Sequence, residues 1–378
     1  MAVRLTLKRR PEPVPGRQRD LRRAGLCLLV GGLALAGCGT ESVSSPPAPK
    51  RIALVYLARG GAIVLASARG EDPRTLGRAE QALLAPDGTR VLALTHGGGT
   101  ARLTLYRTGR TSEPRRLATL GAPSFASTGV QLLAWSPDSR YVALSADALS
   151  GGGEEGVLLL LNVASGQLRT IATGNFLGAS FAPTLPDRLV YSNASISQLD
   201  DNESLLYMSD LSGHHTRELT SSGLASSPAW TAHGILFARL LSLGGPSSSP
   251  RYGLWLIRPD GRGLRRIADF AFGPPVLLDG AAISVSASGR RAVGDFYSAY
   301  SAQPLVDIWE IGIAARSPSA SVIRLPGIRA VAEGISRNGK EILVVAQGSG
   351  STAVESIPWS RGETATLASA GTDPSWNH

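Results

Sequence analysis

A short pattern of apolar and polar residues returns at regular intervals along most of the chain. A bulky apolar residue is followed by a small residue and a tight turn, most clearly in Trp135-Ser136-Pro137-Asp138-Ser139. The bulky positions, spaced by about 49 residues on average, are Leu84, Trp135, Phe181, Trp230, Val285, Ile335 and Trp376. A repeat of this length predicts an array of similar supersecondary units rather than one mixed core.

Each repeat contains β-forming runs and shows no sustained helical periodicity. In one repeat, Tyr141–Ser145 follows the turn, Val157–Leu161 comes next, and Leu168–Ile171 closes the unit. The Asp-Gly, Ser-Gly and Asn-Gly pairs between runs are typical of tight hairpin turns. Four short antiparallel strands per repeat predict the blade of a β-propeller.

The two ends of the repeat array complement each other. Arg51–Leu57, Ala62–Ala66 and Asp72–Leu76 have the pattern of second, third and fourth strands, whereas Asp373–Trp376 has that of a first strand. Pairing between these fragments would remove two exposed sheet edges. The sequence therefore predicts an all-β, seven-bladed β-propeller of four-stranded antiparallel blades, with its ring closed by pairing of the C-terminal strand with the N-terminal blade.

The repeats resemble those of a known family. Trp-Ser-Pro-Asp-Ser at 135–139, Ala-Pro-Asp-Gly at 85–88 and Ser-Pro-Ala-Trp at 227–230 are similar to the PD-type, WD-like repeats of TolB-like propellers. The resemblance covers about residues 50–378 and implies a bacterial envelope propeller. The additional α/β domain of TolB itself has no counterpart in the short segment between Cys38 and Arg51.

The N-terminal segment predicts export and lipid anchoring. A basic stretch up to residue 23 precedes the 13-residue apolar run Ala24–Ala36, which is shorter than the roughly 20 residues of a spanning helix. Leu35-Ala36-Gly37-Cys38 resembles the lipobox of bacterial lipoproteins, which implies cleavage before Cys38 and lipidation of its sulfur. We therefore expect a signal peptide over 1–37, lipidated Cys38 with a Ser/Pro-rich tether over 38–49, and the propeller over 50–378. The mature protein would lie outside the cytoplasm, anchored in the cell membrane or the outer membrane.

Charge and cysteine content exclude several classes of function. The chain has a net charge of +9, of which +6 lies within residues 1–37. No basic stripe remains on the body, so a nucleic-acid partner is not indicated. The two cysteines, Cys27 and Cys38, both precede the predicted propeller, which excludes a disulfide or a cysteine nucleophile there.

The sequence favours a binding module over an enzyme. It contains no Gly-x-Ser-x-Gly motif of the kind found in propeller peptidases. We expect His96, His214, His215, His233 and His378 to be solvated turn residues, and we predict no metal and no cofactor, although the acidic cluster 200–203 leaves a calcium site open. The predicted function is a non-enzymatic scaffold for an envelope protein, peptide or glycan, with membrane attachment through the N-terminal lipid. The alternative is a propeller-type polysaccharide lyase or glycoside hydrolase.

Long loops between second and third strands suggest a binding face. They are expected at 146–155, 193–203, 239–252 and 297–304, all at the same end of the blades. Ordered loops on a rigid scaffold are frequent sites of binding. The candidate binding residues are Glu154, Glu155, Asp200, Asp201, Glu203, Arg239, Arg251, Tyr252, Tyr297 and Tyr300.

Overall fold

The computed structural model describes most of the predicted repeat region. The described residues are 54–109, 113–121, 124–126, 129–150, 153–194, 204–242, 251–271, 283–286, 288–294, 308–313, 319–323, 329–336, 338–347, 352–359 and 365–376. Residues Pro49–His378 form one compact unit. The predicted signal peptide, Cys38 and the tether lie outside the described residues.

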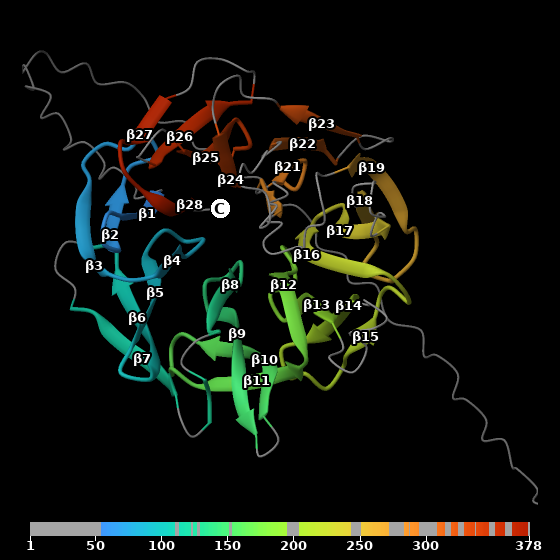
Figure 1. Cartoon of the computed structure of the whole chain (residues 1–378), viewed down its shortest axis with the longest axis horizontal. Coiled ribbons are helices and arrows are strands. Elements are labelled where there is room, and N and C mark those ends of the chain that lie inside the picture. Colours follow the sequence, from blue (N-terminus) through green and yellow to red (C-terminus); the bar gives the residue numbers. More distant parts are fainter. Residues whose placement is uncertain are drawn as a thin grey trace, which may run out of the picture. The chain divides into compact units, whose positions relative to one another are not determined.

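All regular secondary structure within the described residues is β-strand, arranged in groups of four (Figure 1). Group 1 has the order β28-β1-β2-β3, and each later group follows chain order. Group 1 contains β28 (Thr372–Trp376), β1 (Leu54–Ala58), β2 (Ala62–Ala66) and β3 (Arg74–Arg78). Group 2 contains β4 (Gln81–Leu84), β5 (Arg90–Gly97), β6 (Thr100–Arg107) and β7 (Arg115–Gly121). Group 3 contains β8 (Gln131–Trp135), β9 (Tyr141–Ser150), β10 (Gly153–Asn162) and β11 (Leu168–Thr173).

Groups 4 and 5 form one eight-stranded sheet, because Ser204 and Leu224 make a single parallel pair between them. Group 4 contains β12 (Asn175–Phe181), β13 (Arg188–Ala194), β14 (Ser204–Asp210) and β15 (Arg217–Glu218). Group 5 contains β16 (Leu224–Thr231), β17 (Gly234–Ser242), β18 (Arg251–Ile257) and β19 (Arg265–Ala271). Group 6 contains β20 (Ile283–Val285), β21 (Arg291–Gly294), β22 (Ile308–Gly312) and β23 (Ser319–Ile323). Group 7 contains β24 (Arg329–Ile335), β25 (Glu341–Gln347), β26 (Thr352–Pro358) and β27 (Ala365–Ala368).

The predicted strands match these elements closely. Every bulky residue of the repeat pattern lies in a first strand, as Trp135 does in β8 and Ile335 in β24. The C-terminal strand β28 pairs antiparallel with β1, with Leu54 opposite Trp376 and Val55 opposite Ser375. The prediction of an all-β, antiparallel fold is confirmed.

Hydrophobic clusters join each group to the next. Val55 and Ile63 of group 1 pack with Leu84 of group 2, whereas Leu54 and Tyr56 of group 1 pack with Leu343 and other residues of group 7. Alternate side chains of β1 thus face different neighbours, and for that reason β1 is apolar throughout rather than alternating. Similar clusters connect groups 2 and 3, 3 and 4, 4 and 5, 5 and 6, and 6 and 7.

First strands are also connected by side chains that bind the backbone of the next group. The Gln81 side-chain oxygen accepts a hydrogen bond from the Leu132 N–H at 2.8 Å. The Ser180 hydroxyl accepts one from the Trp230 N–H at 3.0 Å, and that of Ser284 from the Ile335 N–H at 3.3 Å. In each contact the donor and the acceptor lie about one repeat apart, and the contacts join groups 2 and 3, 4 and 5, and 6 and 7.

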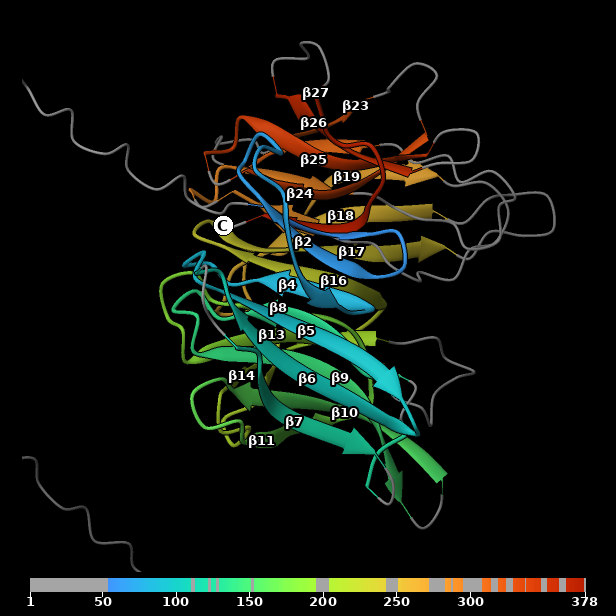
Figure 2. The same ribbon diagram turned by 90° about the vertical axis from the view of Figure 1, so that its left-hand side faces the viewer.

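The groups share two chemically distinct ends. One end, the turn face, carries the turns from first to second and from third to fourth strands, such as 85–90 and 107–115. The opposite end, the loop face, carries the hairpins from second to third strands and the connections between groups, such as Gly97–Thr100 and Ala79–Glu80. In Figure 2 the arrowheads of β5 and β17 both point to the right, toward the loop face.

Candidate functional site

The segment 146–155 of the loop face is a paired hairpin, not the long loop expected from the sequence. Strands β9 and β10 remain in register as far as Ser150 opposite Gly153. The connection before β8 lies along this hairpin, since the Ala126 N–H donates to the Asp147 carbonyl and the Leu149 N–H to that of Ser124. These extra backbone hydrogen bonds favour strand geometry in a segment whose polar, Gly-rich tip indicated a loop.

The hairpin carries two acidic side chains on the loop face. Glu155 is exposed, and Asp147 is half-buried beside Gly129. A Cβ at Gly129 would collide with the Asp147 Oδ2, and the Gly129 φ of +91° is one that other residues rarely adopt. A glycine at this position therefore lets the connection pass close to the Asp147 carboxylate. The backbone of Glu154 lies in the same hairpin, opposite Leu149.

Arg239 is the predicted site residue with the most contacts among the described side chains. Its guanidinium lies 5.3 Å from the ring centroid of Trp255 and donates a 2.9 Å hydrogen bond to the Ser222 hydroxyl. The Trp255 Nε1 is buried and has no hydrogen-bond partner. Trp255 also packs against the cluster between groups 4 and 5.

The other predicted residues are only partly placed. Arg251 and Tyr252 begin β18, where Tyr252 is opposite Leu240, but their side chains lie outside the described part. The remaining candidates, Asp200, Asp201, Glu203, Tyr297 and Tyr300, lie outside the described residues altogether. The acidic cluster with its open calcium assignment is among them.

A histidine–carboxylate pair on the loop face was not expected. The His96 Nδ1 lies 2.6 Å from the Glu80 Oε2, and the His96 N–H donates to the Glu80 Oε1 at 3.0 Å. Because a carboxylate only accepts hydrogen bonds, Nδ1 is the donor, and Nε2 is buried without a partner. The hydrogen bond from the His96 side chain holds the pKa of Glu80 below its usual value. The expectation that His96 is a solvated turn residue was wrong, since only 25% of its side chain is exposed.

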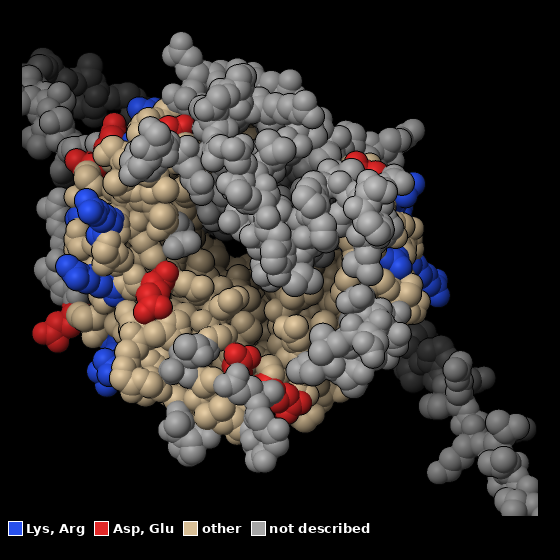
Figure 3. Space-filling view, viewed as in Figure 1, with Lys and Arg blue, Asp and Glu red and all other residues tan. Residues whose placement is uncertain are grey.

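The loop face is acidic around its centre. In Figure 3 the Asp and Glu side chains nearest the central opening lie over β4–β5 and β9–β10, and the described Lys and Arg side chains lie at the margin. At the loop face, the acidic residues with described side chains on or next to these elements are Glu80, directly before β4, Asp147 in β9 and Glu155 in β10. A carboxylate-bearing surface of this kind favours contact with cationic or hydrogen-bond-donating groups.

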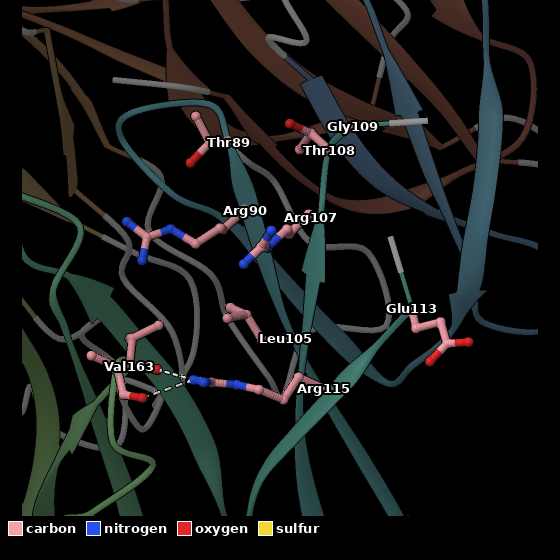
Figure 4. A pocket seen from close by; sticks show the side chains of 10 residues that line it. Thr89, Arg90, Leu105, Arg107, Thr108, Gly109, Glu113, Arg115 and Val163 are labelled. Carbon is pink, nitrogen blue, oxygen red and sulfur yellow. Dashed lines mark hydrogen bonds between the residues drawn. The ribbon is translucent and has the colours of Figure 1, made fainter. Parts of the chain in front are cut away.

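A pocket of about 900 Å³ opens on the turn face between groups 2 and 3 (Figure 4). Its lining includes Arg90, Arg107, Arg115 and Glu113, together with Val163 of the adjacent group. Three guanidinium groups beside one carboxylate would suit an anion. However, the Arg90 Nη2 already pairs with Asp87 at 2.9 Å.

Arg115 in this pocket connects two groups of strands. It donates to the Val163 carbonyl at 2.5 Å and to the Ala164 carbonyl at 3.1 Å. Arg217, at the start of the fourth strand of group 4, donates in the same way to the Pro259 carbonyl of group 5. The contact is therefore repeated, and it indicates a structural role for Arg115 rather than a ligand-binding one.

The described residues contain no group of three or more His, Cys, Asp or Glu side chains arranged to hold a metal ion. Within the same part of the chain, no helix has the length and apolar character needed to cross a bilayer.

Comparison with known proteins identifies the fold. No family model matches the sequence, and no curated protein matches it. The β-propeller domain of the Trilobed protease from Pyrococcus furiosus superposes with a TM-score of 0.53 at 10% identity, over 81% of this chain and 86% of that one. An oligogalacturonate lyase from Vibrio parahaemolyticus superposes with a TM-score of 0.55 at 12% identity, over 83% of this chain and 93% of that one. TolB from Acinetobacter baumannii superposes with a TM-score of 0.48 at 13% identity, over 85% of this chain and 81% of that one. The chain has a β-propeller fold.

Sequence reasoning missed the contacts that join distant segments on the loop face. Glu80 and His96 are 16 residues apart, on a connection and on the end of a second strand. The sequence did indicate where the two residues lie along their strands. Glu80 directly precedes the first strand β4 and His96 is near the end of the second strand β5, and both of these strand ends are at the loop face. Asp147 was missed because the sequence indicates a loop where the structure has a hairpin.

Proposed function

We propose that this protein is a lipid-anchored, extracytoplasmic, seven-bladed propeller that acts as a non-enzymatic binding module. Its partner would be an envelope protein, a peptide or a glycan. In this proposal the strand groups are the blades, and the pairing of β28 with β1 closes the ring. The chain of hydrophobic clusters from group 1 through group 7 and back to group 1 supports the closed arrangement.

The observation that carries the binding function is the β9–β10 hairpin. It extends the loop face with a paired, hydrogen-bonded element that holds Glu155 exposed and Asp147 beside Gly129. A rigid, acidic projection loses little conformational freedom when a partner binds, and this favours recognition. Glu80, on the same face, extends the acidic surface toward β4 and β5.

The test compares the two faces in partner capture. The protein with Glu80→Gln and Glu155→Gln should lose a partner that is cross-linked in intact envelopes, because neutral amides remove the acidic contacts. The matched control, Glu113→Gln with Asp187→Asn, removes two exposed carboxylates from the turn face and should retain that partner. Loss only in the control would contradict the proposed binding face.

A second pair of variants tests the opposite side of the loop face. Arg251→Ala with Tyr252→Ala should weaken capture, whereas His214→Ala with His215→Ala, on the turn face, should not. The latter pair also removes the 2.5 Å contact between His215 and Asp210, so its melting temperature must be measured in parallel.

The alternative function is that of a polysaccharide lyase or glycoside hydrolase. The Glu80–His96 pair favours it, since a carboxylate that orients a histidine is a common feature of general-base and metal-ligand sites. The likeness to an oligogalacturonate lyase adds a substrate class to test. Release of unsaturated uronides from oligogalacturonate, abolished by His96→Ala, would support the enzyme over the binding module.

A further inference from the structure

Basic side chains recur around the turns from first to second strands on the turn face. Arg140, Arg290 and Lys340 are the last residues before a second strand, and Arg90 and Arg188 are the first residues of one. All of them except the half-buried Arg90 are exposed. The fourth strands of groups 1 to 5 have basic residues at their first or second position, and the exposed ones are Arg115, Arg116, Arg169, Arg217, Arg265 and Arg266. The turn face therefore carries an inner and an outer series of cations.

Asp87 and Asp138 are hydrogen-bonded within their own turns, whereas Asp187 in the corresponding turn of group 4 is exposed. The Asp138 Oδ1 accepts hydrogen bonds from the Ser136 hydroxyl at 2.7 Å and from the Arg140 N–H at 3.2 Å. In groups 6 and 7, Ser288 and Asn338 replace the aspartate and accept the corresponding backbone N–H. Arg290 and Lys340 therefore have no carboxylate in their own turn at the position that Asp138 occupies.

The loop face does not share this property. The exposed, described basic residues near it are Arg59, Arg78 and Arg102. They are accompanied by Glu80, Asp147 and Glu155. In Figure 3 acidic side chains lie closer to the central opening than the described basic ones. Within the described residues, the turn face thus carries a surplus of exposed cations, whereas the exposed cations of the loop face are accompanied by as many carboxylates.

The N-terminal segment joins the domain at the turn face. Leu54, the first described residue, is opposite Ala66 and Trp376, which places it at the turn-face end of β1. Only 15 residues separate it from Cys38. A chain of this length extends to about 55 Å at most and averages roughly 20–25 Å when flexible. A lipid on Cys38 would hold the turn face close to the bilayer.

We propose that the turn face docks on the anionic lipid surface that holds the Cys38 lipid, so that the loop face points away from the bilayer. This inference rests on the proposed lipid anchor. Attraction between basic side chains and anionic lipids acts within about one Debye length, near 8 Å at physiological salt. A tether of this length allows the cations of the turn face to come within that range. The same orientation leaves the acidic loop face accessible to a partner.

The orientation can be measured with a single label, because Cys27 is in the predicted signal peptide and Cys38 would be acylated. Ser165→Cys lies on the turn face and Ser221→Cys on the loop face, and both serines are exposed. Each mature, lipidated variant carries a dye and is reconstituted in vesicles that contain a headgroup-attached quencher. With phosphatidylglycerol present, quenching at residue 165 should exceed that at residue 221 by about threefold or more, and the difference should shrink in high salt.

Charge reversal tests which face is responsible. Arg140→Glu, Arg188→Glu and Arg290→Glu together should abolish the difference between the two labels. The matched loop-face control, Arg59→Glu, Arg78→Glu and Arg102→Glu, should preserve it. Unchanged melting temperatures of both triple variants would show that their folds are intact.

The outcomes separate this inference from the proposed function. Failure of the protein to float with vesicles, together with the absence of an acyl mass on Cys38, would contradict the lipid anchor itself. A protein that floats but shows equal quenching at the two labels would overturn the docking proposal alone. Protection of residue 165 in native membranes but not in protein-free anionic vesicles would also overturn it, because an acidic protein would then be the occupant.

Discussion

The turn face and the loop face are made from the same repeats, but their local chemistry differs in kind. On the turn face one arrangement recurs: the hydroxyls of Ser136, Ser286 and Ser336 each accept a backbone N–H from five residues further on. On the loop face the described side-chain contacts are individual, such as Glu80 with His96 and Arg239 with Trp255. Repeated contacts maintain the array, whereas contacts found once mark where a particular function could have been added.

The largest effect should come from removing the strand that completes group 1, on which both faces depend. Deletion of Asp373–His378 removes most of β28 and exposes the edge of β1. Loss of such a strand should cost at least as much as a large core truncation, about 3–5 kcal/mol, and lower the melting temperature by roughly 5–10 °C. The exposed edge should also promote association, measurable by light scattering.

Deletion of His378 alone is the control for the truncation and should leave the melting temperature unchanged. A truncated protein that melts within a degree or two of the intact one would contradict ring closure by the C-terminal strand. In that case the two faces would not depend on a shared closed ring.

Ser136→Ala tests whether the repeated turn chemistry stabilises the fold. The buried Ser136 hydroxyl accepts from the Tyr141 N–H at 2.9 Å and donates to Asp138 at 2.7 Å. Its removal leaves a backbone donor unsatisfied, so the free energy of unfolding should fall by about 1–3 kcal/mol in urea titrations. Ser165→Ala, at an exposed turn, should change it by less than about 0.5 kcal/mol. Equal effects would mean that the recurring serine is incidental.

Much of the turn face could be predicted from sequence because its determinants are local. The Trp135-Ser136-Pro137-Asp138 pattern places a strand end and a turn within a few residues, and the spacing of such patterns predicts the groups. Apolar residues in second and third strands, such as Tyr141–Ser145 and Val157–Leu161, needed only strand propensity to be recognised.

The loop face was less predictable because its contacts depend on how separate segments pass one another. The extension of β9 and β10 depends on the backbone at 124–126 lying alongside, and no composition signal indicates that. The Arg239–Trp255 contact depends on the register of β17 with β18, which places Phe237 opposite Trp255 and Arg239 opposite Gly253. Without a side chain at Gly253, Trp255 and Arg239 lie close together on one face of the sheet.

A smaller effect is expected where the loop face requires a glycine. Gly129→Ala should reduce stability by about 1–2 kcal/mol more than Gly98→Ala, and the difference should appear in the midpoint of chemical unfolding. Both glycines have positive φ, but only at Gly129 would an added Cβ meet a neighbour, the Asp147 carboxylate. Adding Asp147→Ala to Gly129→Ala should recover part of the loss. Equal destabilisation by the two alanines would show that the close approach is unimportant.

The smallest expected effect compares one histidine-paired carboxylate on each face. Hydrogen bonds from the Ser212 hydroxyl and then from His215 hold the pKa of Asp210 well below its usual 3.8. Hydrogen bonds from His96 lower the pKa of Glu80 from 4.5. A carboxyl with a lowered pKa stabilises the folded protein fully above its unfolded-state pKa and loses that contribution as pH falls through the folded-state value.

Asp210→Asn and Glu80→Gln should each reduce stability near pH 7, by about 1 kcal/mol or less because both pairs are partly exposed. The penalty of each variant should diminish below about pH 4, at lower pH for Asp210 than for Glu80. Urea titrations from neutral to acidic pH measure both curves, and a penalty that stays constant across this range would mean that the carboxylate charge does not contribute.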